Sequence, residues 1–338
     1  MSQQKRIVDL DDGTAMVVTD LHGAGPVYEW LRDRFLTLYQ KGEVDRLIIC
    51  GDLIHTIEAP ESDASLPMLL DVMRLQQELG ADTVIMLLGN HELPHIYGIS
   101  LASGNIEYTP RFEAALAQLD EDTSPYTRDD VIDFLKGLPF YARTRGGILF
   151  THAGCSPAVN SVEVAAQLLT FDHDALLEIV DAQVGREVDI EAARRSPAYL
   201  EQARYYLAVS GPEDPRYLHL ARSLFLNADL PGWQLLWDTF FTQHERSIGL
   251  NAHNTVTAQF LEHISAISSH PVQVLVAGHI GCRGGYQLVN SQYLRLATYT
   301  HANPRHEGRY LLVDCAAHVR SADDLLTGIH KAFSEQLI

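Results

Sequence analysis

The sequence predicts an α/β protein in which short buried strands alternate with amphipathic helices. The first observation is a set of short apolar runs, rich in β-branched residues, as strands covered on both faces require. The second is that a polar motif follows each run, where ligands gather in open α/β sheets. The runs are residues 15–19, 47–50, 84–88, 148–151 and 272–277.

Helical patterns separate the first strands. An amphipathic helix is expected over residues 26–42, with Trp30, Phe35, Leu36 and Tyr39 on one side. Further helices are expected over residues 66–79, 111–119 and 128–135, the last opened by Thr127 as its N-cap. Strands alternating with helices in this way imply a mostly parallel sheet with helical cover.

The pattern changes after Pro157, because residues 161–241 contain no strand-like run. Helices are expected over residues 162–169, 174–184, 197–209, 215–226 and 233–240. We interpret residues 161–232 as a helical insertion within a single catalytic domain that spans residues 1–338. An independent helical bundle is the alternative, but polar motifs on both sides of the segment favour the insertion.

The α/β pattern resumes towards the carboxyl terminus. A helix over residues 255–268 precedes the strand at 272–277, and three short strands follow at residues 286–289, 293–298 and 309–313. They indicate an antiparallel sheet edge or a second sheet. Residues 322–333 are expected to close the chain as a helix.

Composition is that of a soluble globular protein with an acidic surface. Of 338 residues, 46% are hydrophobic and 20% charged, and 44 acidic against 25 basic side chains give a net charge of −19. This charge argues against nucleic acid or an anionic membrane as a partner. No apolar run could span a bilayer, and residues 1–12 lack the apolar core of a signal peptide.

Four cysteines, none in a C-x-x-C spacing, suggest free thiols rather than disulfides or a zinc knuckle. Buried free thiols are typical of a reducing compartment, so a cytoplasmic location is expected. The cysteines are Cys50, Cys155, Cys282 and Cys315.

The motifs after the strands supply carboxylate, imidazole and amide oxygen, the ligands that divalent ions take at hydrolytic sites. A pair of such ions stabilises the attacking and leaving oxygens of an in-line displacement, most often at phosphorus. The motifs are Asp20-Leu21-His22-Gly23, Gly51-Asp52, Gly89-Asn90-His91-Glu92, His152-Ala153-Gly154 and Gly278-His279.

These motifs resemble those of the calcineurin-like metallophosphoesterase superfamily, and more closely its phosphoprotein phosphatase (PPP) branch. The resemblance covers about residues 13–157 and 233–315, and it implies a four-layer β-sandwich flanked by helices. Position 281 is glycine, whereas other branches carry a second histidine there. The finer matches are Tyr97-Gly98, His152-Ala153-Gly154-Cys155-Ser156-Pro157, Leu235-Leu236-Trp237, Glu245-Arg246-Ser247 and Gly285-Tyr286.

The resemblance implies two metal ions, one held by Asp20, His22 and Asp52. The second would share Asp52 and add the side chains Asn90, His152 and His279. A hydroxide bridging the ions would attack phosphorus directly.

It also implies roles around the metals. His91 would protonate the leaving oxygen, Arg246 would clamp a phosphate and Tyr286 would line the pocket. Glu92 is expected to support the His91 loop, and His301 is not expected to be a ligand.

One departure concerns the second motif. The PPP branch has an aspartate that orients the acid histidine and an arginine that binds phosphate, whereas this chain has His55 and Thr56. His55 could hydrogen-bond His91, act as a second acid or serve only in packing. Arg283 and Arg305 are candidates for the missing clamp.

The expected function is a PPP-like serine/threonine phosphatase acting on phosphorylated proteins or small phosphoesters. A dinucleoside polyphosphate hydrolase is the alternative, and a silent metal-binding scaffold is a third. Manganese is the expected metal, with iron or zinc possible. The sequence does not indicate an oligomeric state.

Overall fold

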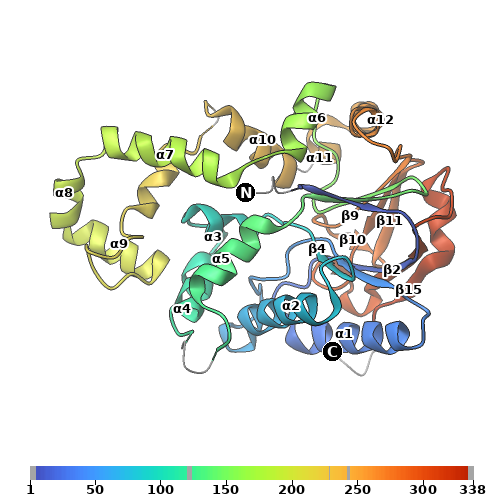
Figure 1. Ribbon diagram of the computed structural model, residues 1–338, viewed down its shortest axis with the longest axis horizontal. Helices are drawn as coiled ribbons and strands as arrows, with labels where there is room; N and C mark the ends of the chain where they lie inside the picture. Colours follow the sequence, from blue (N-terminus) through green and yellow to red (C-terminus); the bar gives the residue numbers. More distant parts are fainter. Residues whose placement is uncertain (1–4, 120–123, 228, 242–243, 334–338) are drawn as a thin grey trace.

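Two β-sheets form the centre of the computed structural model, which describes residues 5–119, 124–227, 229–241 and 244–333 (Figure 1). One sheet has six strands in the order β1-β7-β8-β9-β12-β11, and the other has five in the order β15-β14-β2-β3-β4. The six are β1 (Ile7–Leu10), β7 (Tyr141–Thr144), β8 (Ile148–Thr151), β9 (Val274–Ala277), β12 (Tyr293–Leu296) and β11 (Tyr286–Asn290). The five are β15 (Ile329–Lys331), β14 (Arg309–Asp314), β2 (Thr14–Val18), β3 (Arg46–Ile49) and β4 (Val84–Met86).

The two sheets pack face to face. Alternate residues of both sheets join one buried cluster, while the residues between them face the helices outside. This is the layered sandwich that the sequence predicted. The inner cluster includes Ala15, Val17, Ile48, Cys50, Ile85 and Leu87 from one sheet and Ile148, Phe150, Val274, Val276, Leu294 and Leu296 from the other.

The central strands are parallel, as predicted, and the edges are mixed. Strands β2, β3 and β4 run parallel, and so do β8, β9 and β12. The carboxyl ends of each parallel set therefore lie at one edge of its sheet. Of the three short late strands, β11 and β12 extend the first sheet, and β14 joins the second antiparallel to β2.

Helices cover the outer faces. Helices α1 (Gly25–Gln40) and α2 (Ser65–Leu79) agree with the predicted ranges. Helices α4 (Thr109–Leu116) and α5 (Arg128–Gly137) lie where helices were predicted, although their ends differ by up to three residues. Thr127 caps α5: its hydroxyl accepts from Asp130 N at 3.2 Å, and Asp130 Oδ2 accepts from Thr127 N at 2.8 Å. The short helix α3 (Leu93–Tyr97) follows β4 in the chain. A small two-stranded sheet of β5 (Ala102–Ser103) and β6 (Ile106–Glu107) comes between α3 and α4.

Residues 161–241 contain helices joined by turns, and no strand, where the structure describes them. Helices α7 to α9 lie at one end of the molecule, away from the sheets (Figure 1). The short α8 was not predicted, and residues 215–226 form turns and a 3₁₀ helix rather than an α-helix. The helices of this range are α6 (Val162–Leu169), α7 (His173–Glu187), α8 (Ile190–Arg195), α9 (Pro197–Leu207), η2 (His219–Leu224) and α10 (Pro231–Phe240). Two further helices follow it, α11 (His244–Ile248) and α12 (Leu250–Ala266).

The predicted closing helix over residues 322–333 is wrong. A 3₁₀ helix covers Ala322–Gly328, and Ile329–Lys331 is the strand β15, which pairs antiparallel with β14. A β-carbon at Gly328 would lie 2.1 Å from the carbonyl oxygen of Leu312, so the close approach of two backbones selects glycine here. Pairing with β14 thus overrides the local helical pattern.

The four cysteines are buried free thiols, as predicted. Among the helices of the described residues, none combines the length and the apolarity needed to cross a membrane. The remaining short elements are the β10 (Cys282–Arg283) and β13 (Ala302–Asn303) pair and the 3₁₀ turns η1 (Pro60–Ser62), η3 (Arg305–Glu307) and η4 (Ala322–Gly328).

Candidate metal centre

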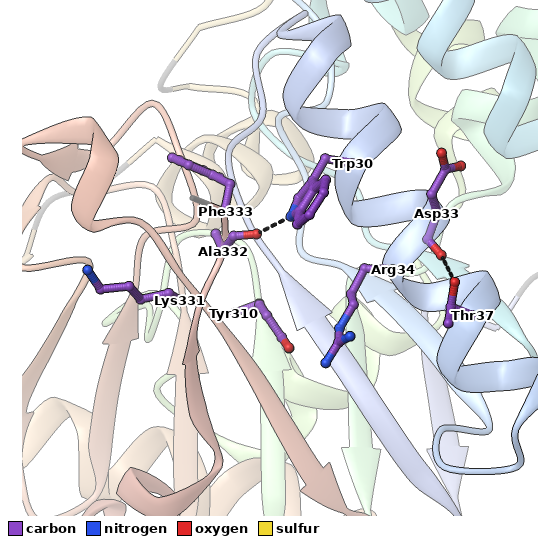
Figure 2. A pocket seen from close by; sticks show the side chains of 8 residues that line it. All are labelled: Trp30, Asp33, Arg34, Thr37, Tyr310, Lys331, Ala332 and Phe333. Carbon is purple, nitrogen blue, oxygen red and sulfur yellow. Dashed lines mark hydrogen bonds between the residues drawn. The ribbon is translucent and has the colours of Figure 1, made fainter. Parts of the chain in front are cut away.

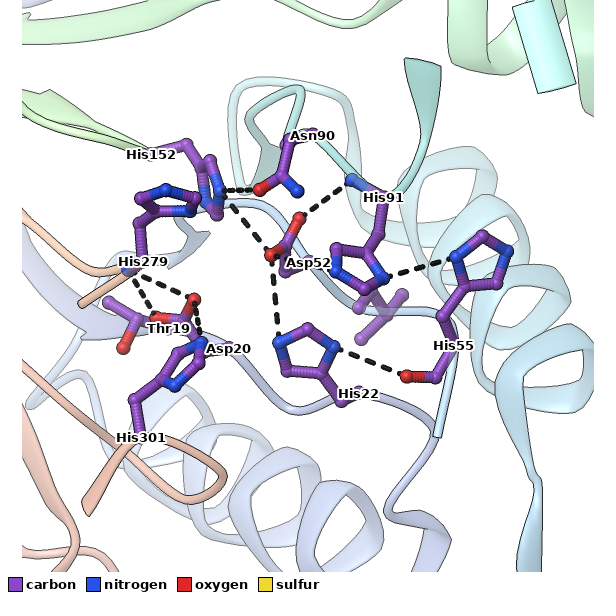
Figure 3. Close-up of polar contacts among 12 residues, drawn as sticks. Thr19, Asp20, His22, Asp52, His55, Asn90, His91, His152, His279 and His301 are labelled. Carbon is purple, nitrogen blue, oxygen red and sulfur yellow. Dashed lines mark hydrogen bonds and ion pairs between the residues drawn. The ribbon is translucent and has the colours of Figure 1, made fainter. Parts of the chain in front are cut away.

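The polar motifs converge where the parallel strands of both sheets end. Figure 3 shows their side chains pointing toward one another from five separate segments of the chain. They follow β2, β3, β8 and β9, which are inner strands of the two sheets, and β4, which lies at the edge of the five-stranded sheet. The side chains are Asp20 and His22, Asp52, Asn90 and His91, His152, and His279.

Asp52 lies between two histidines. Its Oδ2 is 3.5 Å from His22 Nε2 and 3.4 Å from His152 Nε2. Its Oδ1 accepts a hydrogen bond from the backbone N of His91 at 3.0 Å. Burial and the neighbouring Asp20 raise the pKa of Asp52 well above its usual range, so its negative charge requires a nearby cation.

His152 and Asn90 present two lone pairs to each other. The carbonyl oxygen of Cys50 lies 2.9 Å from His152 Nδ1, which therefore carries the hydrogen. With a neutral ring, Nε2 is bare, and it lies 2.8 Å from Asn90 Oδ1. Two acceptors at this distance repel unless a cation binds both, so the pair has the form of a metal-ligand pair.

Asp20 is fixed on the other side of the cluster. The backbone N of His279 donates to both carboxylate oxygens of Asp20, at 3.0 and 3.1 Å. His301 Nε2 lies 3.6 Å from Asp20 Oδ1 (Figure 3). The ligand atoms of Asp20, His22 and His301 lie within 4.8 Å of one another, so the structure adds a histidine that sequence reasoning set aside.

The donor set fits metal ions. Among the described residues, His22 Nε2 and His279 Nε2 are buried and have no hydrogen-bond partner. Burial, followed by the neighbouring His301, lowers the pKa of His22 to about 3, and burial and His152 lower that of His279. The rings are therefore neutral, the form in which imidazole binds a metal, and an ion would satisfy nitrogens that are otherwise costly to bury.

The backbone at this centre is strained. Among the described non-glycine residues, six have positive φ, and five of these belong to the cluster or touch it. Their φ angles lie between 46° and 71°. Such strain persists where the surrounding structure fixes the backbone, and it is concentrated at functional sites. The five are Asp20, His22, Asp52, His55 and His279.

Glu92 supports the loops, as predicted. Its carboxylate is fully buried and accepts from Asp52 N at 3.1 Å, Gly89 N at 3.0 Å and Leu53 N at 3.0 Å. Burial and Asp52 raise its pKa to about 7. Glu92 thus ties the loop after β4 to the loop that carries Asp52.

A comparison with known families decides which class of protein this is. The model of the calcineurin-like phosphoesterase family matches residues 13–218, more than half of the chain. The chain belongs to this family. The phosphoesterase is therefore a metal-dependent hydrolase, with the mixed α/β fold that its sequence predicted.

Solved structures with a similar course of the chain are distant in sequence. A cold-active protein tyrosine phosphatase shares 16% identity, with 92% of this chain and 78% of that one covered and a TM-score of 0.47. A serine/threonine phosphatase of Saccharomyces cerevisiae shares 14% over 92% and 77%, with a TM-score of 0.47. A metallophosphoesterase of Sphaerobacter thermophilus shares 12% over 89% and 82%, with a TM-score of 0.34. No curated protein matches the chain.

The residues that depart from the PPP pattern lie beside the metal centre of the phosphoesterase. His55 Nδ1 is 3.1 Å from His91 Nδ1, so His55 does contact the expected acid. Thr56 is buried, and its hydroxyl accepts from Glu58 N at 3.1 Å. Arg305, a candidate clamp, pairs with the Glu58 carboxylate and so anchors the loop that carries Thr56.

Other expected site residues are more exposed. Arg246 lies on α11 and Tyr286 at the start of β11, and both side chains are exposed. Arg283 is also exposed.

A separate hollow of about 530 Å³ lies between α1 and β15 (Figure 2). Trp30 spans it, and its Nε1 donates to the carbonyl oxygen of Ala332 at 2.9 Å. The expected site residues do not line it. The lining is Trp30, Asp33, Arg34, Thr37, Tyr310, Lys331, Ala332 and Phe333.

Proposed function

We propose that this phosphoesterase is a dinuclear-metal phosphomonoesterase of the PPP type, acting on phosphoserine or phosphothreonine. The observation that carries the proposal is the position of Asp52. With His22 at 3.5 Å on one side of Oδ2 and His152 at 3.4 Å on the other, Asp52 can bridge two ions. A single-ion site would not need a carboxylate between two separate sets of donors.

The two donor sets follow from this bridge. The first ion takes Asp20, His22 and Asp52, with His301 as a further nitrogen within reach of Asp20. The second takes Asp52 together with side chains from three other loops, namely Asn90, His152 and His279. Manganese is the expected metal, with iron or zinc as alternatives.

The metal ions, when bound, polarise the phosphoryl group and lower the pKa of water. The protein supplies position and a proton. His91 Nε2 lies 4.0 Å from Asp52 Oδ2 at the partly exposed side of the centre, where a leaving oxygen can reach it. His91 is therefore the proton donor to the leaving oxygen in this proposal.

The choice of phosphoprotein as substrate rests on the PPP-like motifs. They are the Gly89-Asn90-His91-Glu92 turn, the His152 loop that ends in Ser156-Pro157, and the positions of Arg246 and Tyr286. Arg246 would contact the phosphate, since a guanidinium fits two phosphoryl oxygens. Tyr286 would contact the substrate beside it.

A second candidate is hydrolysis of dinucleoside polyphosphates. The observation that favours it is Thr56, a small buried side chain where PPP enzymes carry a phosphate-binding arginine. Loss of that positive charge alters how the phosphate is held. A silent metal-binding scaffold is disfavoured because the full donor set and His91 are all present.

The test compares two substrates with manganese present. Phosphate release is measured from a phosphothreonine peptide, and from diadenosine tetraphosphate with a coupling phosphatase that cannot cleave the intact dinucleotide. Faster peptide turnover supports the first function, and faster dinucleotide turnover supports the second. If the protein binds two ions per chain but hydrolyses neither substrate, the silent metal-binding scaffold is the hypothesis that remains. Asp52→Asn serves as the inactive control in each assay.

A further inference from the structure

A line of four side chains, the last three of them buried, leads from the metal centre into the helical layer. His91 Nδ1 is 3.1 Å from His55 Nδ1, and His55 Nε2 is 2.7 Å from His95 Nε2. His95 Nδ1 is then 2.8 Å from Glu113 Oε1. His95 lies on α3 and Glu113 on α4, and neither belongs to a motif found in the sequence. We call these four side chains the relay.

The far end of the relay fixes the direction of the hydrogen bond between His95 and Glu113. Arg128 Nη2 donates to Glu113 Oε2 at 2.9 Å, and Arg216 Nη1 lies 3.8 Å from the same oxygen. Although burial alone would raise the pKa of Glu113, the hydrogen bonds from His95 and Arg128 hold it below its usual range. Glu113 is therefore a carboxylate and can only accept.

The hydrogens of the histidines follow in turn. Since Glu113 accepts, His95 Nδ1 carries a hydrogen. In the neutral form of the His95 ring, Nε2 is then bare. His55 Nε2 must then donate to His95, which leaves His55 Nδ1 bare. Burial and His95 lower the pKa of His55 well below its usual range, in keeping with a neutral ring. His91 Nδ1 must therefore donate to His55, and its Nε2 faces the metal centre.

Packing holds the rings in these orientations. Tyr108 stacks on His55 with ring centres 5.3 Å apart and an angle of 12°, and meets the His91 ring edge-on at 4.8 Å. Phe112 lies against His95 at 4.5 Å. His55, His95 and Glu113 expose at most 2% of their surface. Buried polar groups fully paired in this way specify one arrangement.

We propose that His95 and Glu113 are positioning residues that act through His55 to fix the Nδ1–H tautomer of His91, leaving Nε2 to exchange a proton with the leaving oxygen. The proposal deepens the phosphoesterase function proposed above and rests on it. In the PPP pattern a carboxylate contacts the acid histidine directly. Here that carboxylate is two histidines away, which accounts for His55 at the position of the family's aspartate.

The chemistry of proton donation depends on this tautomer. When protonated His91 gives up its proton, the N–H bond at Nε2 breaks and an O–H bond forms on the leaving oxygen. The ring keeps its Nδ1 hydrogen and becomes a neutral imidazole. If the relay ran in the opposite direction, neutral His91 would carry its hydrogen on Nε2, and donation would leave an unfavourable imidazolate.

The variant Glu113→Gln should reverse the relay. Arg128 and Arg216 would draw the amide oxygen, so the amide nitrogen would face His95 Nδ1 as a donor. His95 would then donate from Nε2, and His55 from Nδ1. The matched control is Asp181→Asn, which removes a carboxylate paired with Arg222 at 2.6 Å and lies outside the relay.

The first readout is ¹⁵N NMR of the histidine rings in the zinc-loaded protein, because manganese broadens nearby signals. In wild type we expect hydrogen on Nδ1 of His91 and His95 and on Nε2 of His55. In Glu113→Gln the hydrogen of each of these three rings should move to the other ring nitrogen. Hydrogen on Nε2 of His95 in wild type overturns the proposal without any variant, as do unchanged tautomers in Glu113→Gln.

The second readout is the dependence on the leaving group. Phenyl phosphate needs a proton on its leaving oxygen, whereas 2,4-dinitrophenyl phosphate does not. Glu113→Gln should lower kcat on phenyl phosphate about 10- to 100-fold and on the dinitrophenyl ester less than about threefold, with KM nearly unchanged. Equal losses on both esters would mean a purely structural role. If wild type hydrolyses neither ester, the proposed function fails, while the NMR result still tests the relay.

Discussion

His152 Nε2 lies 2.8 Å from Asn90 Oδ1, although the other nitrogen of the ring already donates to the Cys50 carbonyl. In the neutral ring neither atom can donate to the other, so the positive charge of a metal ion that binds both atoms would stabilise the pair. Binding of that charge is therefore linked to folding.

Removal of metal should lower the stability of the folded protein. An ion that binds only the folded state adds about 4 kcal/mol when its concentration is 1,000 times Kd. Chelation of the metal-loaded protein should thus lower Tm by several degrees, and added manganese should restore it. Differential scanning calorimetry with and without chelator measures this. An unchanged Tm in protein shown to have lost its metal would contradict the linkage.

Asp52→Asn should remove most activity and one or both ions. The amide cannot supply two negatively charged oxygens, so the bridge between donor sets is lost, and kcat should fall by about 10³-fold or more. Metal content per chain, measured by plasma mass spectrometry, should fall below that of wild type. Asp129→Asn is the control, because the Asp129 side chain is 93% exposed. Wild-type turnover in Asp52→Asn would refute the bridging role.

His301→Asn should weaken the binding of one metal ion more than that of the other. The ring lies 3.6 Å from Asp20, and its ligand nitrogen groups with Asp20 and His22 of the first donor set. Affinity for one ion should fall about 10- to 100-fold, the range seen when residues next to a metal are altered. Calorimetric titration of the metal-free protein separates the two sites. If the affinities for the two ions fall equally, or if neither falls, His301 is not a ligand.

Glu92→Gln should destabilise the metal-free protein. Glu92 accepts backbone N–H groups through both carboxylate oxygens, and an amide nitrogen in place of one oxygen would face donors. Unsatisfied buried donors cost about 1–3 kcal/mol. Urea unfolding monitors the change. Loss of activity with no loss of stability would instead indicate a direct catalytic role for Glu92.

The stability of the folded protein should fall with acid through His219. Burial, followed by Arg222, lowers the pKa of His219 to about 3, whereas an unfolded histidine titrates near 6.5. The unfolded chain thus binds the proton first, and the contribution of His219 is present above pH 6.5 and lost as pH falls towards 3. Between pH 7 and pH 5 the loss is about 2 kcal/mol.

His219→Gln tests that pH dependence. Its free energy of unfolding should change less between pH 7 and pH 5 than that of wild type. The control is His318→Gln, which replaces an exposed histidine. Urea unfolding at the two pH values gives the comparison. Equal pH dependence in the variant and wild type would show that His219 does not contribute.

The sheets could be predicted because their strands are continuous apolar runs. The central strands β8 and β9 overlap the runs expected for them, and the motifs follow at their carboxyl ends. The edge strand β1 was missed because it is four residues long and includes Asp9, which pairs with Arg143 on β7. Edge strands depend on such cross-strand pairs more than on hydrophobic pattern.

Sequence reasoning identified the side chains that the structure gathers into the candidate metal centre but not those behind it. Asp20, Asp52 and His152 carry their signal in glycine-flanked motifs after strands. His95 and Glu113 lie within helices, where a buried histidine or glutamate gives no periodic signal. The replacement of the expected aspartate by His55 marked the place, but a hydrogen bond to His91, a second acid and simple packing all remained open.

The left-handed backbone at five residues of the site limits how this enzyme can be engineered. Glycine adopts positive φ without strain, so a change to glycine at Asp20 or His279 would relieve about 1–3 kcal/mol of backbone energy. The same change would delete a metal-binding group. A screen for heat resistance of the metal-free protein would therefore accept inactive variants at these positions, and libraries built from this protein should be selected for turnover and folding together.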